Sequence, residues 1–291
     1  HTEKQALAAH YRPCLRCCPL QYPFQPSLTL NTCLDAIDTN PSKRWTEETI
    51  KALCRNPSTV RRQFKQRFGM TMIQYCRLKR VAGAIKAIRS GQSVTTTQHQ
   101  YGFDSSSGFR DACSRVFGCA PTTVTVNLLY SDWIDTPIGT LMAIADDSGL
   151  YLLRFVDTMD CRQTIKALSQ QLQAVIVPGK TLILNQIQDE LLRYFSGDVQ
   201  QFKTPIHSTI TNSNITLQQY LQQISFGETR SFQSLHTFLG HHHTHQSIVS
   251  SLIDNPFHII VPCHRQLLCD NPSKIKIDRA TWLRSHERRT S

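Results

Sequence analysis

Two helical hairpins about fifty residues apart constrain the fold of this chain more than any other feature. The first ends in Arg67-Phe68-Gly69-Met70-Thr71 and the second in Val116-Phe117-Gly118-Cys119-Ala120-Pro121. A glycine directly after the last apolar residue is typical of a helix C-terminus. One amphipathic hairpin with a charged face is often only a solvated surface. Two hairpins with the same plan and ending indicate a pair of helix-turn-helix units.

The first unit is predicted as a short helix over 47–53, a turn, and a second helix through Phe68. Asn56 and Pro57 are a standard start for the second helix, because asparagine caps a first turn and proline fits the first helical position. Its inward face, at four-residue spacing, should hold Val60, Phe64 and Phe68. Its exposed faces, suited to a DNA major groove, should hold Arg61, Arg62, Lys65, Gln66 and Arg67.

The second unit repeats this plan after a long helix predicted over 72–89. A short helix over 94–98 and a turn at 101–103 lead into a helix that ends at Phe117. We expect Asp104 to be its N-cap, with Ser106, Ser107 and Arg110 near the N-terminal turn. Helix amides and hydroxyls at such a turn bind phosphate.

The charge balance agrees with a polyanion as partner. Lys plus Arg number 32 against 21 acidic residues, so the formal net charge is +11 and the pI is near 9.3. Nucleic acid is favoured over an anionic membrane surface. No apolar run approaches the roughly 18 residues that span a bilayer, so we expect a cytoplasmic protein and no membrane partner. Eleven scattered cysteines favour reduced thiols, a metal site or a nucleophile over a disulfide framework.

Residues from about 28 to 121 resemble the DNA-binding domain of the AraC family. The resemblance rests on a run that ends the second unit, made of Gly102, Phe103, Asp104, Ser106, Phe109, Arg110 and Phe117. It implies an all-α domain with two helix-turn-helix units that binds promoter DNA.

The second half of the chain has a different pattern. Alternating apolar residues over 134–145, a turn at 146–149 and another apolar run over 150–155 predict two strands, and 163–172 and 182–195 read as helices. Further on, the apolar run 257–261 leads into Pro262-Cys263-His264-Arg265. A thiol becomes a good nucleophile only as the thiolate, which an adjacent imidazole favours. A buried structural cysteine beside a surface histidine is the alternative. A cysteine hydrolase is disfavoured, because no second oxyanion-donating motif accompanies the pair.

This half resembles the methylated-DNA-cysteine methyltransferases. Their opening Thr-Pro-x-Gly-x-Leu stands at 136–141, the entry to their first helix at Gly227-Glu228-Thr229, and their active-site signature at 262–265. The resemblance implies a ribonuclease-H-like α/β lobe and a mostly α, winged-helix-like lobe. It also implies that Cys263 takes the alkyl group, that His264 removes its proton through a water, that Glu287 orients His264, and that Asn255 fixes the turn near the thiol. DNA contacts are implied for Phe232, Gln246 and Arg265.

Several positions depart from that family. Gln246 stands where an arginine fills the gap left by the flipped base, and Phe232 replaces a tyrosine whose hydroxyl contacts phosphate. The loop that closes over the base reads Pro-Ser-Lys-Ile-Lys at 272–276, and the run at 213–217 has lost the usual Phe-Gln pair. The nucleophile is therefore kept, while the residues that present the base are altered.

Cys14 and Cys17 form a C-x-x-C pair, which is half of a zinc site, and resemble the end of the zinc domain of the Ada-type regulatory repair proteins. The two upstream cysteines of that domain are not in this chain, which begins at His1 without Met, so we expect a further segment upstream. The nearby residues that could complete the site are Cys18, Cys33 and His10, and free thiols are the alternative. The domain order is then a zinc-domain remnant over 1–26, the AraC-type domain over 27–126, and the two methyltransferase lobes over 127–204 and 205–291. Methyl transfer itself should need no cofactor.

Two functions follow from these resemblances. In the first, the protein is a single-turnover repair alkyltransferase that moves the methyl of O6-methylguanine in double-stranded DNA to Cys263, fused to an activator of the adaptive response that contacts promoter DNA and RNA polymerase. In the second, it is a DNA-binding regulator whose methyltransferase lobe is degenerate and only senses or binds alkylated DNA.

Overall fold

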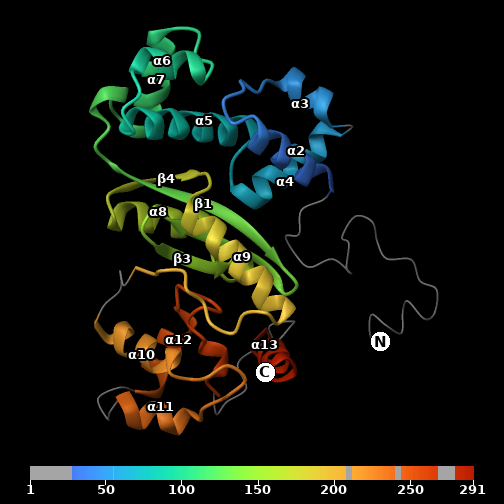
Figure 1. Ribbon diagram of the computed structural model, residues 1–291, viewed down its shortest axis with the longest axis vertical. Helices are drawn as coiled ribbons and strands as arrows, with labels where there is room; N and C mark the ends of the chain where they lie inside the picture. Colours follow the sequence, from blue (N-terminus) through green and yellow to red (C-terminus); the bar gives the residue numbers. More distant parts are fainter. Residues whose placement is uncertain (1–27, 55, 208–211, 240–243, 268–278) are drawn as a thin grey trace, which may run out of the picture.

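A computed structural model describes residues 28–54, 56–207, 212–239, 244–267 and 279–291 (Figure 1). The first part of the described chain is helical. Its helices are α2 (Leu28–Thr39), α3 (Glu47–Leu53), α4 (Pro57–Phe68), α5 (Met72–Arg89), α6 (Val94–Gln100) and α7 (Ser106–Phe117). The predicted pairs α3/α4 and α6/α7 are present, joined by the long α5 helix. The all-α nature of this part is thus confirmed.

The ends of these helices follow the local sequence. Pro57 occupies the first turn of α4, and Gly69 and Gly118 end α4 and α7 in the left-handed region with φ of 70° and 74°. A non-glycine residue there would be strained, which explains the shared Phe-Gly ending. The predicted N-cap Asp104 was wrong by one residue. Ser105 accepts from the backbone N–H of Gly108, while Asp104 pairs with Arg44.

A four-stranded sheet follows, in the order β3-β2-β1-β4. Its strands are β1 (Asn127–Thr136), β2 (Gly139–Ala145), β3 (Leu150–Phe155) and β4 (Ala174–Pro178), with helices α8 (Cys161–Gln171) and α9 (Leu182–Ser196) around it. The two predicted strands correspond to β2 and β3, while β1 was predicted only at its C-terminal end, because the run 134–145 spans the end of β1 and all of β2. β4, which pairs in parallel with β1, was not predicted, because a five-residue apolar segment has too short a pattern to separate a strand from a loop.

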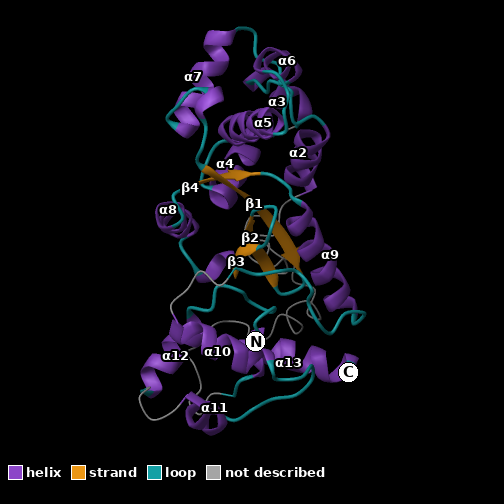
Figure 2. Ribbon diagram, turned by 60° about the vertical axis from the view of Figure 1, so that its left-hand side comes forward, coloured by secondary structure: helices purple, strands orange, loops and turns teal. Residues whose placement is uncertain are grey.

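Opposite faces of the sheet pack against different partners. α9 covers one face, with Ile183, Ile187 and Leu191 in a core cluster shared with β1 and β2. α8 and the first helix-turn-helix unit cover the other face (Figure 2). There, Phe64 and Phe68 share a cluster of buried residues with Trp133. The Phe68 and Trp133 rings meet edge to face at 4.6 Å. The two halves of the chain are therefore joined by a hydrophobic core.

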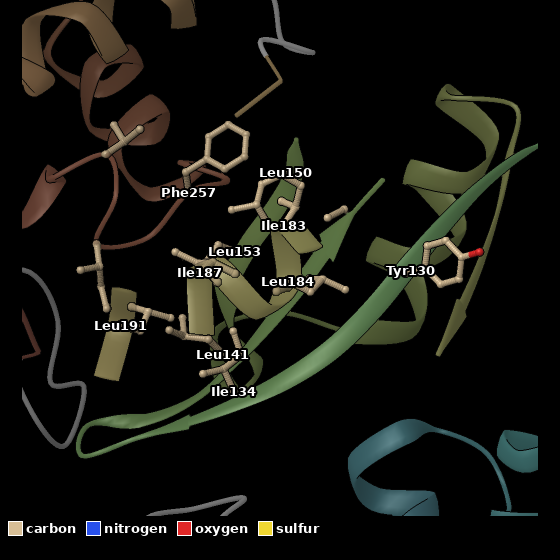
Figure 3. Packing of buried hydrophobic residues seen from close by; sticks show 14 of the residues in the cluster. Tyr130, Ile134, Leu141, Leu150, Leu153, Ile183, Leu184, Ile187, Leu191 and Phe257 are labelled. Atoms are coloured by element: carbon tan, nitrogen blue, oxygen red, sulfur yellow. The ribbon is translucent and has the colours of Figure 1, made fainter. Parts of the chain in front are cut away.

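The C-terminal lobe consists of α10 (Asn212–Gln222), α11 (Phe232–Leu239), α12 (His245–Ile253), the short 3-10 turn η3 (Cys263–Arg265) and α13 (Arg279–Thr290). It docks on the free edge of β3 through two isolated parallel bridges, Leu150 with Ile206 and Leu153 with Phe257. Phe257 extends into the cluster formed with Leu153 and Ile187 (Figure 3). Within the described ranges, no helix is long and apolar enough to cross a membrane.

Candidate active site and DNA-facing surfaces

The segment before Cys263 is held on both sides. Leu153 of β3 exchanges backbone hydrogen bonds with it, donating to Pro256 and accepting from His258 at 2.7 Å each. Asn255, which is buried, donates from Nδ2 to the Val261 carbonyl at 2.9 Å and accepts from the Phe257 N–H at 3.0 Å. These bonds hold the turn that delivers Cys263.

One residue of this turn is strained. Ile259 has φ of 72°, the left-handed region that a β-branched side chain rarely adopts. Such a conformation costs about 1–3 kcal/mol and persists only where surrounding contacts impose it. The buried Ile259 side chain and the Asn255 hydrogen bonds provide those contacts. Backbone strain therefore lies four residues before the thiol.

Cys263 opens the η3 turn and is partly exposed. Burial raises its pKa, while a hydrogen bond with the Asn255 side chain and the charge of Arg154 act in the opposite direction. The net shift is upward, so the resting side chain is a neutral thiol. It needs a base before it can act as a nucleophile.

His264 and Glu287 form a buried pair next to this thiol. His264 Nε2 lies 2.8 Å from Glu287 Oε1, and their side chains are 3% and 1% exposed. His264 Nδ1 is buried and has no hydrogen-bond partner among the described residues. Burial lowers the pKa of His264, although Glu287 opposes the shift. The imidazole is therefore neutral near pH 7 and has one nitrogen free to take a proton.

Arg265 completes this arrangement. Its guanidinium donates from Nε to Glu287 Oε2 at 2.9 Å and from Nη2 to Oε1 at 3.0 Å, and Nη1 donates to the Ile224 carbonyl at 2.6 Å. We call Glu287, His264 and Arg265 with these bonds the Glu287 network. Burial alone would raise the pKa of Glu287, but the hydrogen bonds and charges of His264 and Arg265 lower it to about 2. The carboxylate is permanently charged at neutral pH.

Three predicted DNA contacts in this lobe lie in different environments. Arg265 was predicted to contact DNA. It is 7% exposed and bonded within the Glu287 network, so its guanidinium is not on the surface. Phe232 is 6% exposed and its ring lies 4.4 Å from the His245 ring, so it belongs to the lobe core. Gln246 is exposed on the first turn of α12.

The basic face of α4 is only partly free. Arg61, Arg62 and Lys65 are exposed, with Arg61 paired to Glu47 of α3. The prediction that Arg67 is exposed was wrong. Its side chain is 5% exposed and forms a forked ion pair with Asp135 of β1 at 3.1 Å. The last turn of α4 is therefore part of the junction with the sheet.

At the start of α7, the predicted phosphate contacts Ser106, Ser107 and Arg110 are all exposed. Ser106 also donates to Gln98 Oε1 at 2.8 Å, which ties α7 to α6.

The predicted metal ligands Cys14 and Cys17 lie outside the described residues. Within the described ranges, no group of three or more His, Cys, Asp or Glu side chains could hold a metal ion.

One residue near the thiol was missed by the sequence analysis. Arg154 lies on β3, next to Leu153, which bonds the active-site segment. Its charge lowers the pKa of Cys263, against the larger effect of burial. In the sequence, the only indication of a role for Arg154 was that it is a lone basic residue within the apolar run 150–155.

Comparison with known proteins identifies two domains. A helix-turn-helix domain model matches residues 50–125, and the DNA-binding domain of 6-O-methylguanine DNA methyltransferase matches residues 213–289. The bifunctional transcriptional activator/DNA repair enzyme Ada of Escherichia coli is 27% identical over 275 residues, covering 90% of this chain and 75% of that protein.

Relatives of single parts are also found. A methylated-DNA–protein-cysteine methyltransferase of Methanosarcina barkeri is 25% identical over 49% of this chain and 84% of its own length. A crystal structure of the O6-methylguanine methyltransferase of Mycobacterium tuberculosis covers 56% of this chain and 94% of that one, with a TM-score of 0.46 and 24% identity. The chain therefore joins an AraC-type helix-turn-helix domain to a 6-O-methylguanine DNA methyltransferase domain, which is the combination of the Ada-type bifunctional proteins.

Proposed function

We propose that the protein repairs O6-methylguanine in double-stranded DNA by moving the methyl group irreversibly to Cys263, and that its helix-turn-helix half binds promoter DNA as an activator. One observation carries the proposal. The partly exposed thiol directly precedes a buried histidine that is held by a carboxylate and whose second nitrogen has no hydrogen-bond partner among the described residues. This is the division of labour between nucleophile, base and orienting carboxylate that a triad uses.

The proposed reaction has three steps, which are base flipping, deprotonation of the thiol and methyl transfer. The methylated base leaves the helical stack, since its O6 is out of reach inside a duplex, at a cost of about a few kcal/mol. His264 Nδ1 takes the Cys263 proton through a water, and Glu287 stabilises the imidazolium. The Sγ electron pair forms the S–C bond as the C–O6 bond breaks. The leaving guanine anion takes a proton from solvent at nitrogen, and the imidazolium returns its proton to solvent. The thioether has no route back, so each molecule reacts once.

The neutral resting thiol suits this sequence of events. Burial raises the pKa of Cys263, so the thiol stays protonated until it reacts. It is therefore protected from unspecific alkylation. Deprotonation then depends on His264, whose pKa burial lowers. A base that is neutral at pH 7 is ready to accept a proton.

The test is a measurement of protein mass after incubation with an oligonucleotide that carries O6-methylguanine. One added methyl group is expected on the wild type and on Cys119→Ala, which removes another partly exposed cysteine, but not on Cys263→Ala. An unchanged wild-type mass in the presence of bound DNA would reject the repair activity.

The second candidate function is a regulator whose methyltransferase lobe binds alkylated DNA without reacting. The exposed Gln246 favours it, because a neutral side chain there stabilises the gap left by a flipped base less than a cation would. The same incubation separates the two candidates, since binding without added mass supports the regulator.

Several finer features belong to this proposal as well. The sheet with α8 and α9 is taken as ribonuclease-H-like and the C-terminal lobe as winged-helix-like. Zinc at Cys14 and Cys17, contact with RNA polymerase and a cytoplasmic location stay predictions. Zinc content of the purified full chain, with and without Cys14→Ser, tests the metal.

A further inference from the structure

The Glu287 carboxylate accepts hydrogen bonds from residues of both the C-terminal lobe and the α/β lobe. Within that lobe the donors are His264, Arg265 and the backbone N–H of Gly227, which reaches Oε2 at 3.3 Å. A further donor comes from the other lobe. The Tyr194 hydroxyl of α9 donates to Oε1 at 2.7 Å, the same oxygen that His264 contacts.

The surrounding residues hold the Tyr194 side chain next to Glu287. Its side chain is fully buried and touches the Phe202 and Phe226 rings at centroid distances of 5.4 Å and 6.0 Å. Its carbonyl also lies 2.9 Å from His286 Nε2, one residue from Glu287. The hydroxyl is therefore aimed at the carboxylate by packing on one side and a backbone contact on the other.

The hydroxyl is a donor under all ordinary conditions. Burial raises the pKa of Tyr194, and the charge of Glu287 raises it further. Because the phenol stays protonated and its single proton lies on the bond to Oε1, it competes with His264 for the electron density of that oxygen. Oε1 also accepts from Arg265 Nη2, and a carboxylate oxygen shared by three donors attracts each of them less than one shared by two.

We propose that Tyr194 is a positioning residue for methyl transfer: its hydroxyl fixes the Glu287 carboxylate and limits how strongly that carboxylate holds the proton on His264. The inference rests on the proposed function. It makes the α/β lobe part of the active site, because the carboxylate that orients His264 is held from both lobes.

The test is Tyr194→Phe, which keeps the ring and removes the hydroxyl. Single-turnover methyl transfer is measured by mass against pH. Without the Tyr194 hydroxyl, Oε1 accepts only from His264 and Arg265. The imidazolium then becomes more stable, so the acid limb of the pH–rate profile should move up by about half a pH unit. The rate on the plateau should fall about fivefold as the imidazole loses its fixed orientation.

Tyr220→Phe is the matched control. Tyr220 is also buried, and its hydroxyl has no hydrogen-bond partner among the described residues. Its removal should leave the acid limb in place even if the melting temperature changes. A Tyr194→Phe profile that coincides with those of the wild type and of Tyr220→Phe overturns the inference.

Two further measurements test the role of the Tyr194 hydroxyl. Titration of the His264 ring by NMR needs no turnover, so it reports the expected upward shift in Tyr194→Phe even if the wild type transfers no methyl group and the proposed function fails. Should Tyr194→Phe not fold, protein labelled with 3-fluorotyrosine, a stronger donor, should show the opposite shift of the same ring. An unchanged His264 titration in the folded variant or the labelled protein rejects the role of the hydroxyl.

Discussion

The Glu287 network and the first turn of α12 lie in the same lobe but differ in how strongly the fold constrains them. In the network each charged group is buried and bonded, with Glu287 bridging His264 and Arg265. On α12, Gln246 is exposed, and no side-chain hydrogen bond is seen for it within the described residues. Removing one member of the network leaves a buried charge unpaired, whereas an exposed side chain can change at little cost to stability.

This difference explains how the two parts of the site can diverge separately. In the proposed function, the chemical step depends on groups that the fold itself requires, so their loss is opposed by stability as well as by activity. Base presentation in that proposal depends on surface side chains that the fold does not require. A chain can therefore keep the nucleophile and its base while the residues that present the base change.

The largest expected effect that tests this comparison is on Glu287. Glu287→Gln leaves Arg265 buried without a counter-charge and should lower the free energy of unfolding by about 3–5 kcal/mol. Gln246→Ala should change it by less than about 0.5 kcal/mol. Urea unfolding of both variants measures the contrast. Equal effects at the two positions would remove the distinction between them.

Acid pH should reveal the same network without a mutation. The pKa of Glu287 is lowered from 4.5 to about 2, so its contribution to stability is complete above pH 4.5 and is lost as the pH falls toward 2. The contribution amounts to about 3 kcal/mol by linkage. Urea unfolding at a series of acid pH values measures it. In Glu287→Gln the fall should be shallower, and an equally steep fall would assign the acid sensitivity to other groups.

The next prediction concerns Gln246 on the exposed first turn of α12. In the proposed function, residue 246 supports base flipping. Gln246→Arg places a cation there, so methyl transfer from O6-methylguanine in duplex DNA should become about tenfold faster, the equivalent of about 1.4 kcal/mol. Transfer from the free base O6-methylguanine should not change, because no flipping is needed. Parallel rate measurements on the two substrates decide it, and an equal gain on both would place the effect in the chemistry instead.

The smallest expected effect lies farthest from the thiol. Neutralising Arg61 or Arg62 should weaken binding to duplex DNA and reduce the slope of log affinity against log salt by about one unit. Cys263→Ala should leave that slope unchanged. Titrations at several salt concentrations measure it, and an unchanged slope in Arg62→Gln would count against α4 as a DNA-contacting helix.

Local patterns predicted the elements of this protein well. The ends of α4 and α7 follow from Pro57, Gly69 and Gly118, since caps depend on residues within one turn. Alternating apolar residues predicted β2 and β3. β4 was missed, because its identity depends on pairing with β1, which lies 47 residues earlier along the chain at Asn127 and Ala174.

Predictions about exposure were weaker than predictions about elements. Arg67 and Arg265 are basic residues in polar patterns, and both are buried against carboxylates from distant parts of the chain. A helical pattern places a side chain on a face but does not say what covers that face. The Phe232 ring was likewise assigned to the DNA surface by resemblance, while packing against His245 buries it.

By itself, the sequence determined the two helix-turn-helix units, the apolar strands and the cysteine next to a histidine, because each of these depends on neighbouring residues. Only the tertiary structure decided which arginines are buried and that Tyr194 reaches Glu287, 93 residues further along the chain. The physical reason is that burial and charge pairing depend on which surfaces meet. In this chain those surfaces are the two lobes around Glu287 and the sheet face under α4.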